Sequence, residues 1–430
     1  MFTAPHHRFH RRHVLQAGFL GGIGLSLANY LRLAESSEIK PSAKACIFIH
    51  LKGGPAHLDT LDMKPNAPSE EQGEFKRIQS AIPGYEVCEH LPKLAKVIDR
   101  FTLIRGISHA AGAHPLANEY LYTGNRPTPA VVYPSMGSIS GKELSSPSAV
   151  PPFVAIPNSD MGPGYLGVAH GSFKTTSIPK AGQPYQVRGL AMAQGVTVEK
   201  IKARNELLRD LDQTFRAADA NSPLLDGLDR FGQKAQEMIL SDQSRKAFDI
   251  SLESPAILAS FEKDDVSQSL LLAQRLVEHG TRFVTVTHDG WDTHTENFTS
   301  LKNKLLPPFD AGLSSLVLAL ETKGLLDDVM VVATGEFGRT PSINGNGGRD
   351  HWPRTMWTLV AGGGAKRAYF LGGTDEKGHG PDEGTHLTPD DLAATIYHAL
   401  GIDPQKEYFT RTERPVLLVP EGHVMQDLFA

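Results

Sequence analysis

Residues 268–294 read QSLLLAQRLVEHGTRFVTVTHDGWDTH, and this stretch decides the fold. Residues 268–279 have the apolar spacing of a helix, and Gly280 stands where a helix ends in the left-handed conformation that glycine adopts easily. Residues 282–287 (RFVTVT) are typical of a buried strand. The stretch therefore predicts a helix, a sharp turn and a buried strand, with the polar residues 288–294 directly after the strand.

The same order recurs along the chain. A helical pattern over 309–323 ends at Gly324 and precedes the apolar run 329–334, and another over 390–400 ends at Gly401. Two further strands are predicted at 45–51 and 355–360. Alternating helices and buried strands favour an α/β layered fold with a mainly parallel sheet. In such sheets, ligands bind beyond the carboxyl ends of the strands.

Charge, hydrophobic fraction and cysteine count exclude several classes of protein. The 430 residues carry a net charge of −5, which argues against a protein that binds nucleic acid by neutralising phosphates. The hydrophobic fraction of 40% excludes a multi-span membrane protein. Cys46 and Cys88 are the only cysteines, so a tetrathiolate zinc site is excluded and a single disulfide remains open.

The N-terminus resembles an export signal. Arg11 and Arg12 precede a mildly apolar, glycine-rich stretch from Val14 to Leu33, as in twin-arginine signals. We predict a leader at residues 1–40, a partner in the twin-arginine export machinery, and a periplasmic or cell-surface location. An ordinary amphipathic helix or a single membrane anchor is the alternative. Glycines and polar residues make the stretch a poor bilayer-spanning helix, so we expect no stable span in the mature chain.

Residues 41–430 are predicted to form one domain. A charged helical insert is expected at about 190–265, because 197–215 place apolar side chains on one helical face and 226–248 continue in the same style. Its charges are most simply a solvated face.

Acidic and histidine side chains follow the predicted strands. The candidate metal ligands are His57, Asp59, Asp289, Asp292, His294, Glu336, Asp350 and His351. Each group alone also fits a capped turn or a hydrogen-bonded pair, but four groups along one sheet edge favour a metal site. Oxygen and imidazole ligands without thiolates suit Zn²⁺, Mn²⁺, Mg²⁺ or Ca²⁺.

Several long motifs resemble one family. They are FIHLKGGPAHLDTLDMKP (48–65), LANEYLYTGNRP (116–127), the stretch 270–294, VVATGEFGRTPSINGNGGRDHWP (331–353) and DLAATIYHALGID (391–403). Together they resemble the domain of unknown function 1501 family, which is described as sulfatase-like and assigned to the alkaline phosphatase superfamily. The resemblance implies an alkaline-phosphatase-like three-layer sandwich with a central, mostly parallel mixed sheet. It also implies one or two divalent metals that activate a nucleophile against a phosphate or sulfate ester.

The superfamily's site residues match this chain only in part. Asp59 matches the aspartate after the first strand, and Asp289 or Asp292 with His294 resembles the mid-chain Asp and His, at a different spacing. Glu336 matches the aspartate of a Thr-Ser-Asp-His-Gly motif, whereas Phe337 replaces its histidine and cannot bind a metal. Asp350 and His351 are expected to compensate, and His386 is a weaker match to a late ligand.

The sulfatase nucleophile is missing. Tyr122-Thr123-Gly124 matches the Leu-Thr-Gly that follows the sulfatase cysteine, and counting back places His114 at the cysteine position. No formylglycine can form there. His114 is therefore a nucleophile, or a metal ligand or general acid/base, or part of a dead site. Arg339 or Arg349 is expected to offset the anionic oxygens of the substrate.

These observations predict an exported, metal-dependent hydrolase of sulfate or phosphate esters that lacks a Cys or Ser nucleophile. Its substrate would be an anionic ester or a sulfated glycan. The alternative is a catalytically inactive sulfatase-like protein that binds metal, sulfated glycan or a protein partner at the cell surface.

Overall fold

The computed structural model describes residues 39–183 and 241–430, without 145, 147, 148 and 411, and also residues 185 and 187. The leader expected at 1–40 falls, up to residue 38, outside the described residues. The same holds for 188–240, the larger part of the expected insert. The described residues from Pro41 to Ala430 belong to one compact unit.

An eight-stranded mixed sheet forms the centre, in the order β12-β4-β11-β8-β1-β7-β5-β6. Its strands are β1 (Ala45–Leu51), β4 (Phe101–Ile107), β5 (Phe153–Ile156), β6 (Phe173–Lys174), β7 (Phe283–His288), β8 (Val329–Thr334), β11 (Met356–Ala361) and β12 (Tyr369–Leu371). The central strand β1 is parallel to both neighbours, with His50 opposite Thr287 of β7 and Thr334 of β8. Only β11 runs against its neighbours, so the sheet is mixed and mostly parallel.

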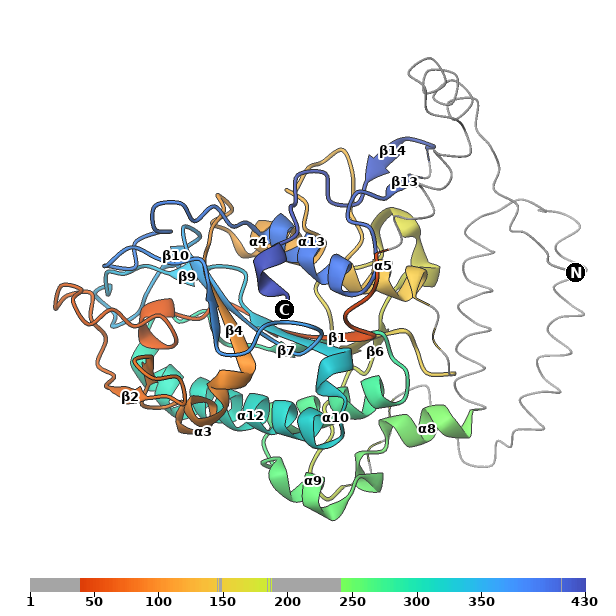
Figure 1. The fold of residues 1–430 in the computed structure, drawn as a ribbon, viewed down its shortest axis with the longest axis horizontal. Coiled ribbons are helices and arrows are strands. Elements are labelled where there is room, and N and C mark those ends of the chain that lie inside the picture. The colour runs from red at the N-terminus through yellow and green to blue at the C-terminus, as the bar shows by residue number, and fades with distance from the viewer. Residues whose placement is uncertain are drawn as a thin grey trace, which may run out of the picture. The chain divides into compact units, whose positions relative to one another are not determined.

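Helices cover both faces of the sheet (Figure 1). One layer holds α3 (Pro92–Val97), α10 (Asp265–Glu278) and α12 (Leu306–Thr322), and the other holds α4 (His114–Thr123), α5 (Met136–Glu143) and α13 (Pro389–Ala399). Strand β1 alternates between them: Ile47 and Ile49 join the first core, and Cys46 and Phe48 join the second. Burying each such large side chain contributes roughly 1.5–3 kcal/mol. The predicted three-layer α/β sandwich is therefore confirmed.

The glycines end the helices as predicted. Gly280, Gly324 and Gly401 follow α10, α12 and α13 with φ of +103°, +65° and +75°. The strand predicted at 355–360 exists as β11, although it is antiparallel. Cys46 and Cys88 are both buried and free, and they belong to the cores on opposite faces of the sheet.

Smaller elements complete the described part. They are the hairpins β2 (Arg77–Gln79)/β3 (Glu86–Cys88), β9 (Gly338–Arg339)/β10 (His351–Trp352) and β13 (Glu407–Phe409)/β14 (Pro415–Leu417), and the helices α8 (Asp242–Phe248), α9 (Pro255–Ser260) and α11 (Asn297–Ser300). Helix α8 coincides with the last residues of the helix expected at 226–248, whose earlier part lies outside the described residues. The division into a leader, one domain and an insert stays a prediction.

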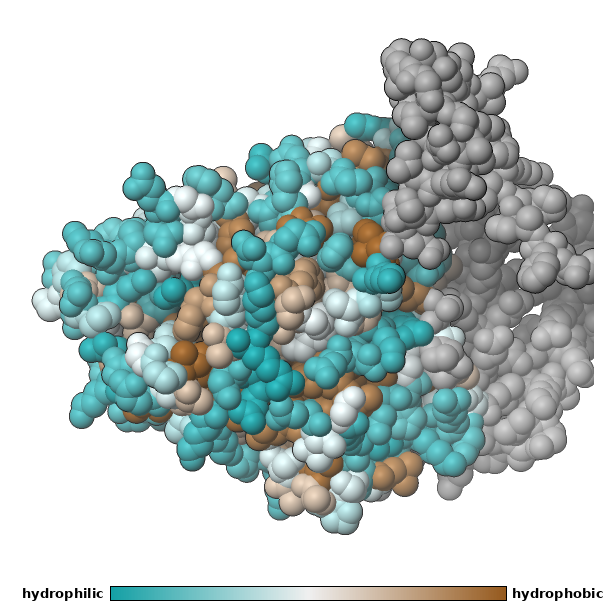
Figure 2. Space-filling model, viewed as in Figure 1, coloured by the Kyte–Doolittle hydropathy of each residue, from teal (hydrophilic) through white to brown (hydrophobic). Residues whose placement is uncertain are grey.

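Most of the surface shown in Figure 2 is hydrophilic, and its apolar side chains lie in small separate groups. Across the described residues, every helix is too short or too polar to cross a bilayer.

Candidate metal centre

Three neighbouring strands deliver the polar loops to one edge of the sheet. Strands β8, β1 and β7 lie side by side and are parallel, so the loops after them leave from the same edge. Hydrogen bonds join the loops. The backbone N–H of Trp291 donates to the carbonyl of Lys52 at 3.0 Å, and the backbone N–H of Gly53 donates to the Glu336 side chain at 3.0 Å. Gly53 has φ +113°, and a Cβ there would collide with the backbone of Asp292. Glycine therefore permits the close approach of the first two loops.

Asp292 is the hub of a cluster of imidazoles. Its Oδ2 lies 3.2 Å from His114 Nε2, and its Oδ1 lies 3.1 Å from His294 Nε2 and 3.3 Å from His351 Nε2. The Nε2 atoms of His294 and His351 are 2.9 Å apart. Ligand atoms of His114, Asp292 and His351 all lie within 4.8 Å of one another. Two distant loops and the N-terminus of α4 thus bring four potential ligands together.

Each histidine is held through its other ring nitrogen. The Nδ1 of His114 is 2.6 Å from Glu336 Oε1, that of His294 is 2.6 Å from Asp350 Oδ1, and that of His351 is 2.8 Å from the carbonyl of Gly112. Carboxylates and carbonyls only accept hydrogen bonds, so these partners assign the proton of each neutral imidazole to Nδ1. The three Nε2 lone pairs then face Asp292. Among the described residues, buried His114 Nε2 makes no well-aligned hydrogen bond, although Asp292 Oδ2 lies 3.2 Å away.

A divalent cation fits this arrangement. Four acceptors that face one another repel unless a proton or a cation lies between them. Ligands bonded at about 2.0–2.1 Å to a tetrahedral metal lie about 3.3 Å apart. Asp292 lies 3.1–3.3 Å from the three Nε2 atoms, and those of His294 and His351 are 2.9 Å apart. The group whose ligand atoms all lie within 4.8 Å of one another consists of His114, Asp292 and His351, so His294 is the outermost of the four. Histidines that donate Nδ1–H to a carboxylate or a carbonyl are the usual outer support of such ligands.

Arg339 holds the carboxylate of Asp292 in place. The guanidinium is fully buried on β9 and donates to Asp292 Oδ1 at 2.6 Å. Its other N–H groups bind the carbonyl of Gly54 at 3.1 Å, that of Arg349 at 3.1 Å, and that of Gly53. Burial alone would raise the pKa of Asp292, but the hydrogen bond and charge of Arg339 lower it. Arg339 therefore binds the protein's own groups and keeps Asp292 ionised.

Glu336 is a fully buried carboxylate with several donors. It accepts hydrogen bonds from Gly53 N, from His114 and from His50 Nε2 at 3.1 Å. These contacts outweigh the effect of burial and hold the pKa of Glu336 far below its usual range, so it is ionised. The same hydrogen bond raises the pKa of His114, against the effect of burial. Phe337 packs beside them, with its ring 5.0 Å from His114 and 4.6 Å from His351.

The remaining candidates lie in other surroundings. Asp59 is fully buried and paired with Arg349 through two contacts of 2.7 Å, and Asn297 donates to it at 2.7 Å. His57 Nε2 bonds to the carbonyl of Gly378 at 2.8 Å, and burial lowers its pKa. Asp289 is exposed and accepts from the N–H of Gly290. The structure does not join these three to the Asp292 cluster, and their role as metal ligands stays a prediction.

His50 is a further residue of the site that was not among the sequence candidates, and its partner Tyr122 was identified only as the match to the leucine of Leu-Thr-Gly. Both are buried, and Tyr122 OH lies 3.0 Å from His50 Nδ1. A signal was present, because the period of two along β1 places His50 on the same face as Cys46 and Phe48. A histidine on an apolar strand face needs partners for both ring nitrogens.

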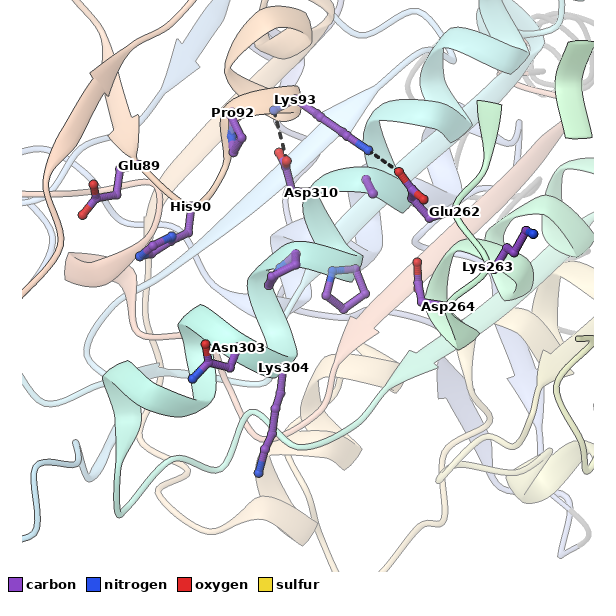
Figure 3. Close-up of a pocket in the computed structure, with 13 residues that line it drawn as sticks. Glu89, His90, Pro92, Lys93, Glu262, Lys263, Asp264, Asn303, Lys304 and Asp310 are labelled. Atoms are coloured by element: carbon purple, nitrogen blue, oxygen red, sulfur yellow. Dashed lines mark hydrogen bonds and ion pairs between the residues drawn. The ribbon is translucent and has the colours of Figure 1, made fainter. Parts of the chain in front are cut away.

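A pocket of about 660 Å³ lies away from this edge, between the start of α3 and that of α12 (Figure 3). Asp310 accepts there from the N–H of Lys93 at 3.0 Å, and the Lys93 ammonium pairs with Glu262 at 2.8 Å. None of the residues that line this pocket has a buried polar atom without a partner. The pocket lining therefore contains no unpaired buried side-chain atom that would indicate a bound ligand.

Comparison with known proteins gives a family and remote fold likenesses. The family described as protein of unknown function (DUF1501) matches residues 43–429. No curated protein matches the chain. Similar solved structures include the lipoteichoic acid synthase LtaP from Listeria monocytogenes, with 13% identity, TM-score 0.33, and coverage of 84% of this chain and 72% of that one.

Two others are hydrolases by name. Alkaline phosphatase from the Antarctic bacterium TAB5 has 11% identity and TM-score 0.35, and the match covers 84% of this chain and 98% of that one. The phosphonate monoester hydrolase of Agrobacterium radiobacter has 10% identity and TM-score 0.36, with coverage of 86% and 75%.

Proposed function

The chain belongs to the DUF1501 family of proteins of unknown function, so its own site has to indicate the chemistry, and we propose that it is a metal-dependent hydrolase of sulfate or phosphate esters. One observation carries the proposal. Three imidazoles, each held by an acceptor at Nδ1, place Nε2 within 3.3 Å of a single carboxylate, Asp292.

The proposed ligands are His114, Asp292, His294 and His351. A divalent cation bound by them supplies Lewis-acid activation of an ester and of water. A set rich in imidazole favours Zn²⁺ over Mn²⁺, Mg²⁺ and Ca²⁺, which prefer oxygen ligands. Of the roles open to His114, the position of its Nε2 supports that of a ligand. Burial lowers the pKa of His351, which keeps its imidazole neutral and able to bind a cation.

The supporting residues prepare the ligands. Glu336 fixes the ring of His114 and Asp350 fixes that of His294, both at 2.6 Å. Arg339 keeps Asp292 ionised and limits its rotation. Ligands that are already oriented lose little freedom when a cation binds, which favours tight and geometrically defined binding.

We also propose the setting of this activity. The Arg11-Arg12 leader supports export by the twin-arginine machinery to the periplasm or cell surface. The substrate would be an anionic ester, such as a sulfated glycan.

A second candidate is an inactive binding protein on the same fold, with metal, sulfated glycan or a protein partner as its ligand. One observation favours it. Arg339 and Arg349 are both fully buried and bonded to protein groups, so neither offers its charge to a substrate as the sequence led us to expect.

The test compares Asp292→Asn with Asp327→Asn, whose side chain is 94% exposed near the opposite ends of the strands. Metal content after dialysis is measured by elemental mass spectrometry. Hydrolysis of chromogenic sulfates and phosphates is measured with Zn²⁺, Mn²⁺, Mg²⁺ and Ca²⁺.

We expect bound metal and hydrolysis in the wild type and in Asp327→Asn. In Asp292→Asn we expect a loss of metal affinity beyond the roughly 10–100-fold that outer-shell substitutions cause. A wild-type protein without metal affinity would refute the centre. Metal without hydrolysis of any ester would leave the binding protein as the function.

A further inference from the structure

We propose that His50, in the core beneath the centre, is a positioning residue that orients His114 through Glu336. The proposal rests on the proposed metal centre, but it concerns a residue that touches none of the four ligands. Its evidence is a closed circuit of hydrogen bonds within the described core.

The circuit starts at Tyr122. Its hydroxyl lies 3.0 Å from His50 Nδ1, and the two rings meet edge to face with centroids 5.1 Å apart. His50 Nε2 lies 3.1 Å from Glu336 Oε2, and Glu336 Oε1 lies 2.6 Å from His114 Nδ1. An ionised carboxylate only accepts, so Nε2 of His50 donates the proton and Nδ1 accepts the hydroxyl hydrogen of Tyr122. The direction of each hydrogen bond is thereby fixed.

Helix α4 closes the circuit. His114 is its first residue and Tyr122 lies in its last turn, so both ends of one helix are tied to the same carboxylate. One tie is direct, and the other passes through His50 on β1. A helix fastened at both ends cannot slide or rotate against the sheet without breaking one of these bonds. The imidazole of His114 is fixed with it.

Burial makes His50 difficult to replace. The side chains of His50 and Glu336 have no exposed surface. Glu336 Oε2 has two donors, His50 Nε2 at 3.1 Å and Gly53 N at 3.1 Å. Gly53 N lies equally close to Oε1, at 3.0 Å, so it does not hold Oε2 in place by itself. Without His50, the carboxylate can rotate about this shared donor, which moves Oε1 out of line with His114. The His114 imidazole then loses the partner that places its proton on Nδ1.

Two substitutions separate the two contacts. In His50→Gln the amide reaches the place of Nε2 and keeps the bond to Glu336. In His50→Asn the shorter amide lies at the place of Nδ1, so it keeps Tyr122 and loses Glu336. Phe48→Leu is the matched control, because Phe48 lies on the same face of β1 and packs on Tyr122 with ring centroids 5.6 Å apart.

Two measurements report on orientation. Zn²⁺ affinity is determined by competition with a chromogenic chelator, and the His114 tautomer is determined by ¹⁵N NMR with labelled histidine, assigned with His114→Gln. We expect His50→Asn to weaken Zn²⁺ binding about 10–100-fold and to convert His114 from the Nδ1–H form to a mixture. His50→Gln, which loses only the Tyr122 contact, should keep the His114 tautomer and weaken Zn²⁺ binding no more than about 2- to 10-fold. Phe48→Leu should lower only the melting temperature.

A His50→Asn protein that melts like Phe48→Leu, but keeps wild-type Zn²⁺ affinity and the His114 tautomer, would overturn the proposal. If His50→Asn does not fold, Tyr122→Phe replaces it. It removes one hydrogen bond and should weaken Zn²⁺ binding about 2- to 10-fold. Unchanged affinity and tautomer would again overturn the proposal. If the wild type binds no metal, the proposed function fails by itself, and the tautomer still decides the role of His50.

Discussion

The buried pair of Asp59 and Arg349 gives the sharpest test of how the structure divides ligands from supports. The sequence predicts Asp59 as a metal ligand, whereas the structure gives both its oxygens to other partners. Arg349 donates to Oδ1 and Oδ2 at 2.7 Å each, and Asn297 donates to Oδ2 at 2.7 Å. Neither side chain of the ion pair has exposed surface. We therefore predict that Asp59→Asn acts mainly on stability.

The magnitude follows from the donors. An asparagine at position 59 offers one carbonyl oxygen where the carboxylate offers two. Whichever way the amide lies, at least one buried N–H of Arg349 or Asn297 meets an NH₂ group. Removing one partner of a buried ion pair costs about 3–5 kcal/mol. We expect a loss of this size in the free energy of unfolding.

Urea unfolding with and without Zn²⁺ measures the loss, and a Zn²⁺ titration of the folded protein measures the affinity. We expect an earlier unfolding midpoint for Asp59→Asn and an affinity close to that of the wild type. The matched control is Asp327→Asn, whose exposed side chain should change neither the unfolding midpoint nor the affinity. An Asp59→Asn protein that unfolds like the wild type but loses its metal would refute the reasoning and make Asp59 a ligand.

Two further predictions concern the same edge of the sheet. Burial lowers the pKa of His288 to about 4, so as the pH falls from 6.5 to 4 the unfolded chain binds this proton and the folded protein does not. The free energy of unfolding therefore falls by up to about 3 kcal/mol over this range. His288→Leu should remove this part of the pH dependence in urea unfolding. Unchanged pH dependence would contradict it. Gly53→Ala should displace the Asp292 backbone and weaken metal binding, whereas Gly84→Ala, with φ +80° and open space around it, should cost only about 1–3 kcal/mol of backbone strain. Equal effects on metal affinity, read by Zn²⁺ titration, would exclude the steric explanation.

The fold could be predicted because its signals are local. The helices α10, α12 and α13 show their apolar spacing and their terminal glycines in consecutive residues. The direction of β11 could not be predicted in this way. A buried strand has the same apolar run in either direction, and only its partners β4 and β8 show that it is antiparallel.

The site could be predicted in its residue types but not in its grouping. The sequence places Asp289 and Asp292 in one short stretch. Both side chains are exposed, but the turn at Gly290, with φ +101°, brings only the second to the imidazoles. Spacing along a loop does not determine which side chains converge. His50 could not be recognised from the sequence for a different reason. It lies within an apolar strand, where the significance of a histidine depends on which residues face it.

The net charge of the centre favours binding of a divalent cation over binding of a sulfate or phosphate group without a metal. Asp292, Glu336 and Asp350 are three carboxylates with lowered pKa, and within the described part of the chain Arg339 is the one guanidinium bonded to them. When the three imidazoles are neutral, the centre carries two negative charges, and a proton on His114, whose pKa Glu336 raises, would remove one of them. A sulfate or phosphate group would be repelled by such a site, and a divalent cation would neutralise it. Any anionic ester therefore requires the cation first, which makes glycan binding without metal the weaker alternative at this edge.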